Sequence, residues 1–477
     1  MFNIGLNKNS NTIITTFLSY LPSRLLVVLN SLVIVPIFAH LMTTNEVGIF
    51  QLTIGILNLV CTCSTDWIAK SALRFYDKYN SSGQKDEFFS NLLWLTLFIY
   101  FLIFLGFIIF SDFVLEKFLI SKGIFLITLF LVIPTGIRQF LYQMLRVLNR
   151  PFLYSFSIII YQMSLLILFL VFTGIFPNVI AVLVAMAIAM FIIDFYIFNR
   201  ISFRVKIYKK LNKSILLESL KYALPQILTN TSIWAILNVN KFIFQYDKFF
   251  DDTAVAGISW LFVTSILTPI LSTFSFAIFP TIIKKYELKD RIKPFVTNTI
   301  QLYCVLFLPV VSIFCYFSKD VAELAFAGKY PQSYILLSFF ALSLFVHELM
   351  KLFNIKYHLQ NKTYIEMLVA IFVGLICLNL NLIFISRFHL VGAGCAMLSS
   401  IILLLIFNLA IQSKNTNYVS YVRVIKTILI SVLIGFISYI FVQLLFIPIG
   451  YISILKILTY AFCCYMLSFM SAKRLVG

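Results

Sequence analysis

The chain has 477 residues, of which 61% are hydrophobic and only 12% are charged. A soluble domain carries about 25% charged residues, and a soluble chain this apolar could not cover its surface with polar groups. The composition therefore excludes a soluble protein and makes lipid the solvent for most of the chain, in agreement with a mean hydropathy of +1.00.

The formal net charge is +19, with 37 Lys and Arg residues against 18 Asp and Glu residues. In a soluble protein this excess would indicate a nucleic-acid partner. Cytoplasmic loops of membrane proteins collect Lys and Arg, so the charge here predicts orientation and no nucleic-acid partner.

Charged and turn residues interrupt the apolar stretches at close to the 20 residues that a helix needs to cross the hydrocarbon. This spacing predicts fourteen transmembrane helices. The expected spans are 12–39, 46–68, 88–110, 123–145, 152–173, 178–197, 222–244, 254–282, 295–317, 331–353, 364–386, 391–412, 424–446 and 451–471.

The basic residues alternate between successive loops. Each predicted inner loop between two spans holds at least three Lys or Arg residues, and no outer loop holds more than two. The alternation predicts a multi-pass protein with both termini in the cytoplasm.

The loops and cysteines argue against an enzyme. Membrane glycosyltransferases and sugar-chain polymerases usually carry their chemistry on a large outer loop, and the longest loop here is an inner one around 199–221. The eight cysteines lie in apolar stretches without metal-site spacing. We expect no catalytic residues, no metal and no cofactor.

The two halves of the chain resemble each other weakly, at offsets that drift in order through 203, 209 and 212 residues. Six helices return the chain to its starting side, so the repeats are parallel. The matching pairs are Tyr20-Leu21-Pro22 with Tyr222–Pro225, Glu46–Ile49 with Ala254–Ile258, and Asn149-Arg150 with Asn361-Lys362.

The repeat predicts an all-α integral membrane fold with two six-helix lobes around a central cavity and two extra C-terminal helices. The expected boundaries are 1–210 for the N-terminal lobe, 211–415 for the C-terminal lobe and 416–477 for the added helices.

Several short motifs, in order along the chain, resemble those of the polysaccharide repeat-unit flippases (Wzx type, as in O-antigen and lipopolysaccharide synthesis) of the multidrug/oligosaccharidyl-lipid/polysaccharide exporter superfamily. They are Leu41–Phe50, Ala72–Tyr76, Lys221–Pro225, Ala277–Pro280, Leu378–Ile383 and Val391–Ala393. The chain departs from the family pattern at His389, which replaces a Gly, and at Gly394, which replaces an Ala. Asn240-Lys241 stands where the family often has Asp-Arg.

The resemblance implies a cationic cavity that moves undecaprenyl-pyrophosphate-linked oligosaccharide from the inner to the outer leaflet of a bacterial inner membrane. It implies membrane lipids, a polysaccharide polymerase and chain-length proteins as partners.

A pyrophosphate headgroup needs fixed positive charge, and Arg binds phosphate bidentately. Arg138 is the first candidate, because the uncharged stretch 123–137 is too short to span and the helix must carry Arg138 into the membrane. Arg138, Tyr142, Arg146 and Asn149 share one helical face. The alternative is that these arginines reach back to the lipid headgroups.

Further basic candidates for the cavity are Arg24, Arg74, Lys241 and Lys351. Arg24 could also lie at the inner mouth, and Lys351 could form a local pair with Glu348. His347, next to Glu348, is more typical of a satisfied core residue than of a proton carrier.

The acidic candidates for ion coupling are Asp66, Asp194 and Glu348, each with structural ion pairing as the alternative. Asp66 has Lys70 one helical turn away. These few acids also define the rival function, a drug or organic-cation exporter of the same fold, which would need carboxylates in its cavity.

Overall fold

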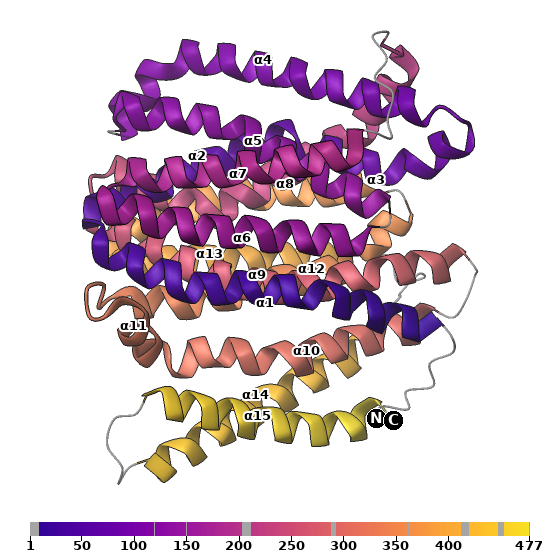
Figure 1. The fold of residues 1–477 in the computed structure, drawn as a ribbon. Helices are drawn as coiled ribbons and strands as arrows, with labels where there is room; N and C mark the ends of the chain where they lie inside the picture. Colours follow the sequence, from indigo (N-terminus) through magenta and orange to yellow (C-terminus); the bar gives the residue numbers. More distant parts are fainter. Residues whose placement is uncertain are drawn as a thin grey trace. The chain divides into compact units, whose positions relative to one another are not determined.

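The computed structural model describes residues 9–118, 120–148, 150–202, 211–287, 292–360, 362–411, 419–446 and 453–476. These residues form fifteen helices and no strand (Figure 1). The helices are α1 (Asn9–Leu41), α2 (Thr44–Ser64), α3 (Asp66–Ser81), α4 (Lys85–Phe118), α5 (Lys122–Val147), α6 (Pro151–Ile175), α7 (Val179–Ser202), α8 (Lys213–Tyr246), α9 (Phe250–Glu287), α10 (Ile292–Tyr316), α11 (Ser318–Phe326), α12 (Ser333–Leu359), α13 (Thr363–Ile411), α14 (Tyr421–Phe446) and α15 (Ser453–Val476).

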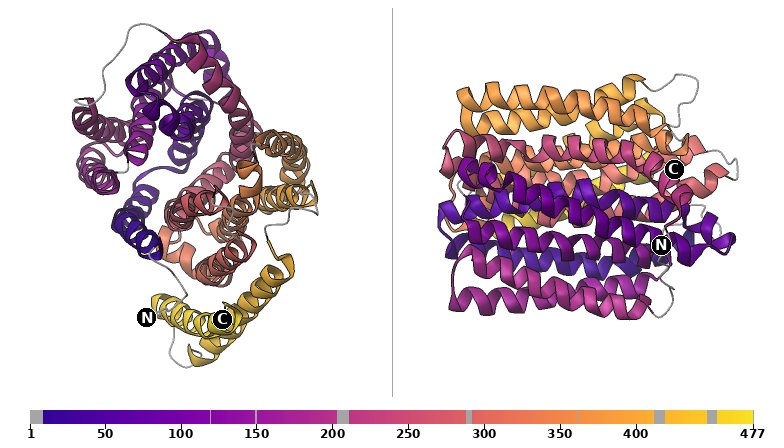
Figure 2. Two further views of the ribbon diagram at one scale, coloured as in Figure 1. Left: turned by 90° about the vertical axis from the view of Figure 1, so that its right-hand side faces the viewer. Right: turned by 90° about the horizontal axis from the view of Figure 1, so that it is seen from above.

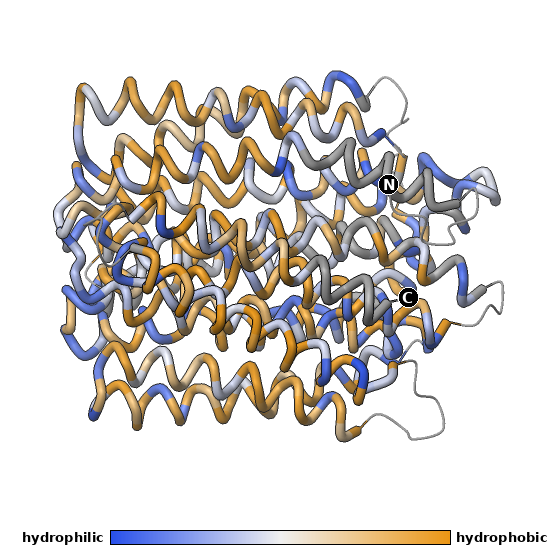
Figure 3. Tube along the Cα trace, turned by 90° about the horizontal axis from the view of Figure 1, so that it is seen from below, coloured by the Kyte–Doolittle hydropathy of each residue, from blue (hydrophilic) through white to orange (hydrophobic). Residues whose placement is uncertain are grey.

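The helices confirm the predicted all-α membrane fold. Among the described residues, α3 and α11 are too short to span, and α13 contains two helices that meet at His389. The other twelve helices, together with the two parts of α13, supply one helix for each of the fourteen predicted spans. Within the part of the chain that the structure describes, eleven helices are long and apolar enough to cross a membrane by length and composition. Apolar residues cover the middle of the helices and hydrophilic ones gather towards their ends (Figure 3).

The chain divides into two compact units. The N-terminal unit contains Ser19–Gly257 and Ala370–Leu378, and thus α1 from Ser19 onward, α2 to α8, and short parts of α9 and α13. The C-terminal unit contains the described residues of Met1–Leu18, Ile258–Val369 and Asn379–Gly477. In each unit long helices lie side by side, as the end-on view shows (Figure 2). The repeat-based lobe boundaries stay a prediction.

The second predicted span was wrong at its end. It ran to residue 68, whereas α2 ends at Ser64 and a new helix, α3, begins at Asp66. The break lies at Thr65, whose φ of −121° is not helical. The Thr65 backbone N–H still donates to the carbonyl oxygen of Cys61 at 2.9 Å, so this last helical bond of α2 is kept and the chain changes direction only after it.

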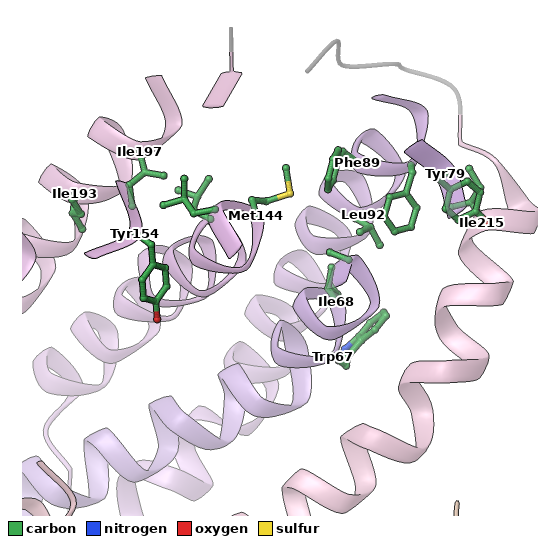
Figure 4. Close-up of a cluster of buried hydrophobic side chains, with 14 of the residues drawn as sticks. Trp67, Ile68, Tyr79, Phe89, Leu92, Met144, Tyr154, Ile193, Ile197 and Ile215 are labelled. Atoms are coloured by element: carbon green, nitrogen blue, oxygen red, sulfur yellow. The ribbon is translucent and has the colours of Figure 1, made fainter. Parts of the chain in front are cut away.

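The core of the N-terminal unit joins α3 to its neighbours. Trp67 and Ile68 of α3 are buried in a cluster that extends to Tyr154 of α6 and Ile215 of α8. Figure 4 shows this cluster, with the Tyr154 hydroxyl pointing away from Ile197. The apolar cluster fixes the ring of Tyr154, and thereby α6, in the N-terminal unit.

Outside the predicted spans, an ion pair also ties α3 to α8. Lys78 donates to Glu218 at 2.5 Å, and the Tyr79 hydroxyl donates to the same carboxylate at 2.6 Å. These hydrogen bonds, Lys78 first, hold the pKa of Glu218 below its usual range. The first turns of α8 are thereby attached to the N-terminal unit.

In the C-terminal unit, α14 and α15 pack on α10. Phe317, Val442, Tyr460 and Cys464 form a small buried cluster. The hydroxyl groups of Ser312 and Tyr460 lie 2.6 Å apart, which adds a hydrogen bond between α10 and α15.

The turn inside α13 places a non-glycine residue in a strained conformation. His389 has φ 47° and ψ −124°, a region that favours glycine. This is the position where the family motif has Gly, so the departure seen in the sequence falls on the strained residue.

We expect His389→Gly to stabilise the protein by about 1 kcal/mol, the strain relieved minus the added freedom of the unfolded chain. His389→Ala keeps the strain and serves as the control. Thermal unfolding of the purified protein checks this, and equal melting temperatures for the Gly and Ala variants would show that His389 is not strained.

Candidate substrate site

Arg138 lies on α5 within the N-terminal unit and stacks on an aromatic ring from α6. Its guanidinium carbon is 4.3 Å from the ring centroid of Tyr161, a favourable cation–π distance. The side chain is half-buried, and its Nη1 atom is buried without a hydrogen-bond partner. Arg138 therefore keeps a donor unused inside the membrane span.

A chain of tyrosines links Arg138 to a second arginine. Arg24 of α1 donates from Nη2 to the Tyr154 hydroxyl at 2.9 Å. The ring of Tyr154 meets the ring of Tyr142 edge-on, with centroids 5.3 Å apart. Tyr142 follows Arg138 by one turn of α5. Helices α1, α5 and α6 thus place two guanidinium groups against tyrosines, Arg24 on Tyr154 and Arg138 on Tyr161. We call this group the arginine–tyrosine site (Arg24, Arg138, Tyr142, Tyr154 and Tyr161).

The site is held in place by polar contacts between helices. The Asn30 amide donates to the backbone oxygen of Gln162 at 2.7 Å, which joins α1 to α6. The Thr65 hydroxyl donates to Gln139 at 3.1 Å, next to Arg138 on α5. These bonds reduce the freedom of the helices that carry the arginines.

An acidic side chain, Asp194 of α7, lies beside the site. Asp194 is 7% exposed, and neither carboxylate oxygen has a hydrogen-bond partner. The charge of Arg138 acts on this carboxylate. Tyr100 of α4 also lies near Asp194, and its buried hydroxyl has no partner. A Cβ at Gly136 would clash with that hydroxyl, so the glycine lets Tyr100 approach α5.

The other basic residues predicted in the N-terminal half lie differently. Arg146 donates to Gln143 at 3.0 Å on its own helix, and Arg74 is exposed on α3. Asn149, predicted on the same face as Arg138, and the side chain of Asp66 lie outside the described residues.

In the C-terminal unit, Lys351 forms the local pair that the sequence offered as its alternative. Its Nζ lies 2.6 Å from Glu348 Oε1 on the same helix, α12. Glu348 is buried, and so is the neighbouring His347. The pair neutralises Lys351 locally and leaves less charge for an anion than the arginine–tyrosine site does.

Lys241 of α8 is 2% exposed and donates to the Asn238 side chain at 3.0 Å. A buried ammonium in a membrane span is costly and needs polar neighbours. Its assignment to the substrate cavity stays a prediction.

Sequence reasoning missed Tyr154 and Tyr161, because tyrosines in a membrane protein are mostly lipid-facing or structural. The two residues are seven apart on α6 and therefore share one helical face. This spacing could have indicated that Tyr154 and Tyr161 lie opposite Arg138, because the Arg138 face of α5 needs polar partners.

Comparison by sequence finds no matching family model and no matching curated protein. Comparison of structures finds similar solved chains. A lipid II flippase, MurJ, in an inward closed conformation matches with a TM-score of 0.71 at 15% identity, over 97% of this chain and 100% of that chain.

Two transporters of the MATE type also match. The eukaryotic MATE transporter AtDTX14 gives a TM-score of 0.63 at 9% identity, over 87% of this chain and 98% of its own. An inward-facing multidrug resistance MATE transporter of the MOP superfamily gives 0.60 at 15% identity, over 81% and 93%. The chain is therefore a multi-pass membrane protein with the fold that MurJ and the MATE transporters share.

Proposed function

We propose that the protein translocates undecaprenyl-pyrophosphate-linked oligosaccharide repeat units from the inner to the outer leaflet of a bacterial inner membrane by alternating access. The observation that carries the proposal is the arginine–tyrosine site, where Arg24 contacts Tyr154 and Arg138 contacts Tyr161 inside the membrane spans. Charged residues in a span are costly and mark substrate pathways.

The chemistry of the site suits a pyrophosphate that carries a sugar. Each guanidinium can bind one phosphate through two parallel hydrogen bonds, and the low dielectric strengthens that attraction. The tyrosine hydroxyls can donate to the remaining phosphate oxygens. Their rings offer flat faces and the Asn30–Gln162 pair offers amides nearby, as sugars require.

The fold supports the same proposal. The similarity to the lipid II flippase extends over nearly the whole of both chains. Membrane lipids would be neighbours of the exposed apolar helix faces. A polymerase and chain-length proteins would act on the delivered repeat units.

Deleting the gene tests the proposal. Loss of a flippase should leave lipid-linked repeat units on the inner leaflet, protected in intact cells from an enzyme that acts from outside. Restored accessibility on re-expression of the wild type is the control. Normal outer-leaflet delivery in the deletion strain would reject the proposal.

The rival function, export of drugs or organic cations, is favoured by Asp194, whose buried carboxylate could attract a cation. Arg138 beside it opposes that role, because its positive charge repels a cation at the same place. Increased drug sensitivity in the deletion strain with normal repeat-unit delivery would favour the exporter.

A further inference from the structure

Asp194 combines deep burial with unsatisfied hydrogen bonding. Removing an ionised carboxylate from water is expensive unless hydrogen bonds compensate. Here both oxygens of Asp194 are buried without a hydrogen-bond partner, although the guanidinium of Arg138 is close enough to act on them. Asp194 therefore balances the charge of Arg138 without engaging its donors.

The groups around Asp194 and its immediate neighbours are one cation and four neutral side chains. In the described residues, the titratable and charged groups that interact electrostatically with Asp194 or with its immediate neighbours are Arg138 and Tyr142 of α5, Tyr100 of α4, Tyr161 of α6 through Arg138, and Cys61 of α2 through Tyr100. Arg138 is thus the one cation of this set, and it is always protonated.

An anionic headgroup that binds Arg138 competes with Asp194 for the same positive charge. A carboxylate and a phosphate beside one guanidinium repel each other strongly in a low-dielectric site. Protonating Asp194 removes this repulsion. It also turns an unsatisfied acceptor into a hydroxyl donor, which suits a phosphate oxygen.

We propose that Asp194 is a built-in counter-ion of Arg138 that the substrate phosphate displaces, so that binding of each anionic headgroup places one proton on Asp194. The proton comes from the aqueous phase that reaches the open site, and it leaves when the headgroup departs. Substrate and proton then occupy the site together. This inference rests on the proposed function, because it requires an anionic substrate at Arg138.

Proton uptake on binding can be measured directly by calorimetry. The full-length protein in lipid nanodiscs is titrated with farnesyl-pyrophosphoryl-N-acetylglucosamine between pH 6 and 8, in two buffers that differ in ionisation enthalpy. Both phosphates of this probe are esterified, so the probe itself does not titrate in this range. We expect uptake of about one proton per bound probe. The affinity should therefore fall as the pH rises, by up to about tenfold per pH unit.

The variants separate Asp194 from other carboxylates. Asp194→Asn should bind without proton uptake and with an affinity that does not change with pH. Asp194→Glu should keep the uptake, which covers the possibility that the Asn variant fails to fold. Glu116→Gln, which alters an exposed carboxylate of α4, should match the wild type.

The outcomes also distinguish this inference from the proposed function. Two results would overturn the counter-ion role alone. One is probe binding that requires Arg138 without any change in bound protons, and the other is unchanged proton uptake by Asp194→Asn. Absence of probe binding by the wild type, or full binding by Arg138→Gln, overturns the anionic site and the counter-ion role together.

Discussion

Arg138→Gln should lower repeat-unit transport by about a hundredfold while the protein remains folded in the membrane. Removing one partner of a buried charged hydrogen-bonded pair costs 2–5 kcal/mol, and each 1.4 kcal/mol is a factor of ten. Arg138→Lys should lose about tenfold, because the ammonium keeps the charge but lacks the planar fork that binds phosphate bidentately. Complementation of a deletion strain, normalised to the amount of membrane protein, measures both effects.

A matched control is Arg387→Gln, which removes an exposed arginine from α13 and should transport at the wild-type rate. Normal transport by Arg138→Gln would show that no substrate charge depends on Arg138. A loss of the same size in the Arg387 variant would mean that total positive charge matters rather than this position.

Among single Gly→Ala substitutions, Gly392→Ala should cause the largest loss of folded protein. The added Cβ would lie 2.5 Å from the backbone carbonyl carbon of Phe384, across the turn inside α13. Backbone atoms cannot rotate away as a flexible side chain can, so the two helices must separate. We expect a destabilisation of about 3 kcal/mol or more, measured as lost monodisperse protein and a lower melting temperature.

The control is Gly106→Ala in α4, where no atom lies within 4 Å of the added Cβ. This variant should be neutral or slightly stabilising, because alanine favours a helix more than glycine does. Equal stability of the two variants would show that the packing at the α13 turn is looser than described.

The number and order of the membrane spans were predictable because lipid imposes one rule on every helix, about 20 apolar residues between charges. The same rule failed where a helix is not simply apolar. The composition around Thr65 does not predict the break between α2 and α3, because the break depends on local backbone geometry. Helix α8 is predicted by its place between charged loops, since it is not among the eleven described helices that are long and apolar enough to cross a membrane.

The candidate site was predictable in part. Arg138 and Tyr142 were predicted as site residues because the fourth span must carry the charge of Arg138 into the membrane and Tyr142 lies on the same helical face. Their partners Tyr154, Tyr161 and Asp194 come from α6 and α7, and one sequence does not show which faces of separate helices meet. The sequence also predicted Lys351 as a cavity residue. Its local pair with Glu348 depends on side-chain geometry, which the sequence does not fix.

Reconstitution into liposomes tests the central claim most directly. A fluorescent prenyl-pyrophosphate-linked oligosaccharide is placed in both leaflets, and its exposure to a membrane-impermeant quencher is followed over time. Wild-type protein should make the inner-leaflet probe accessible, and Arg138→Gln should not, while neither transports the organic cation ethidium. Transport of ethidium by the wild type, with no movement of the lipid-linked probe, would contradict the account.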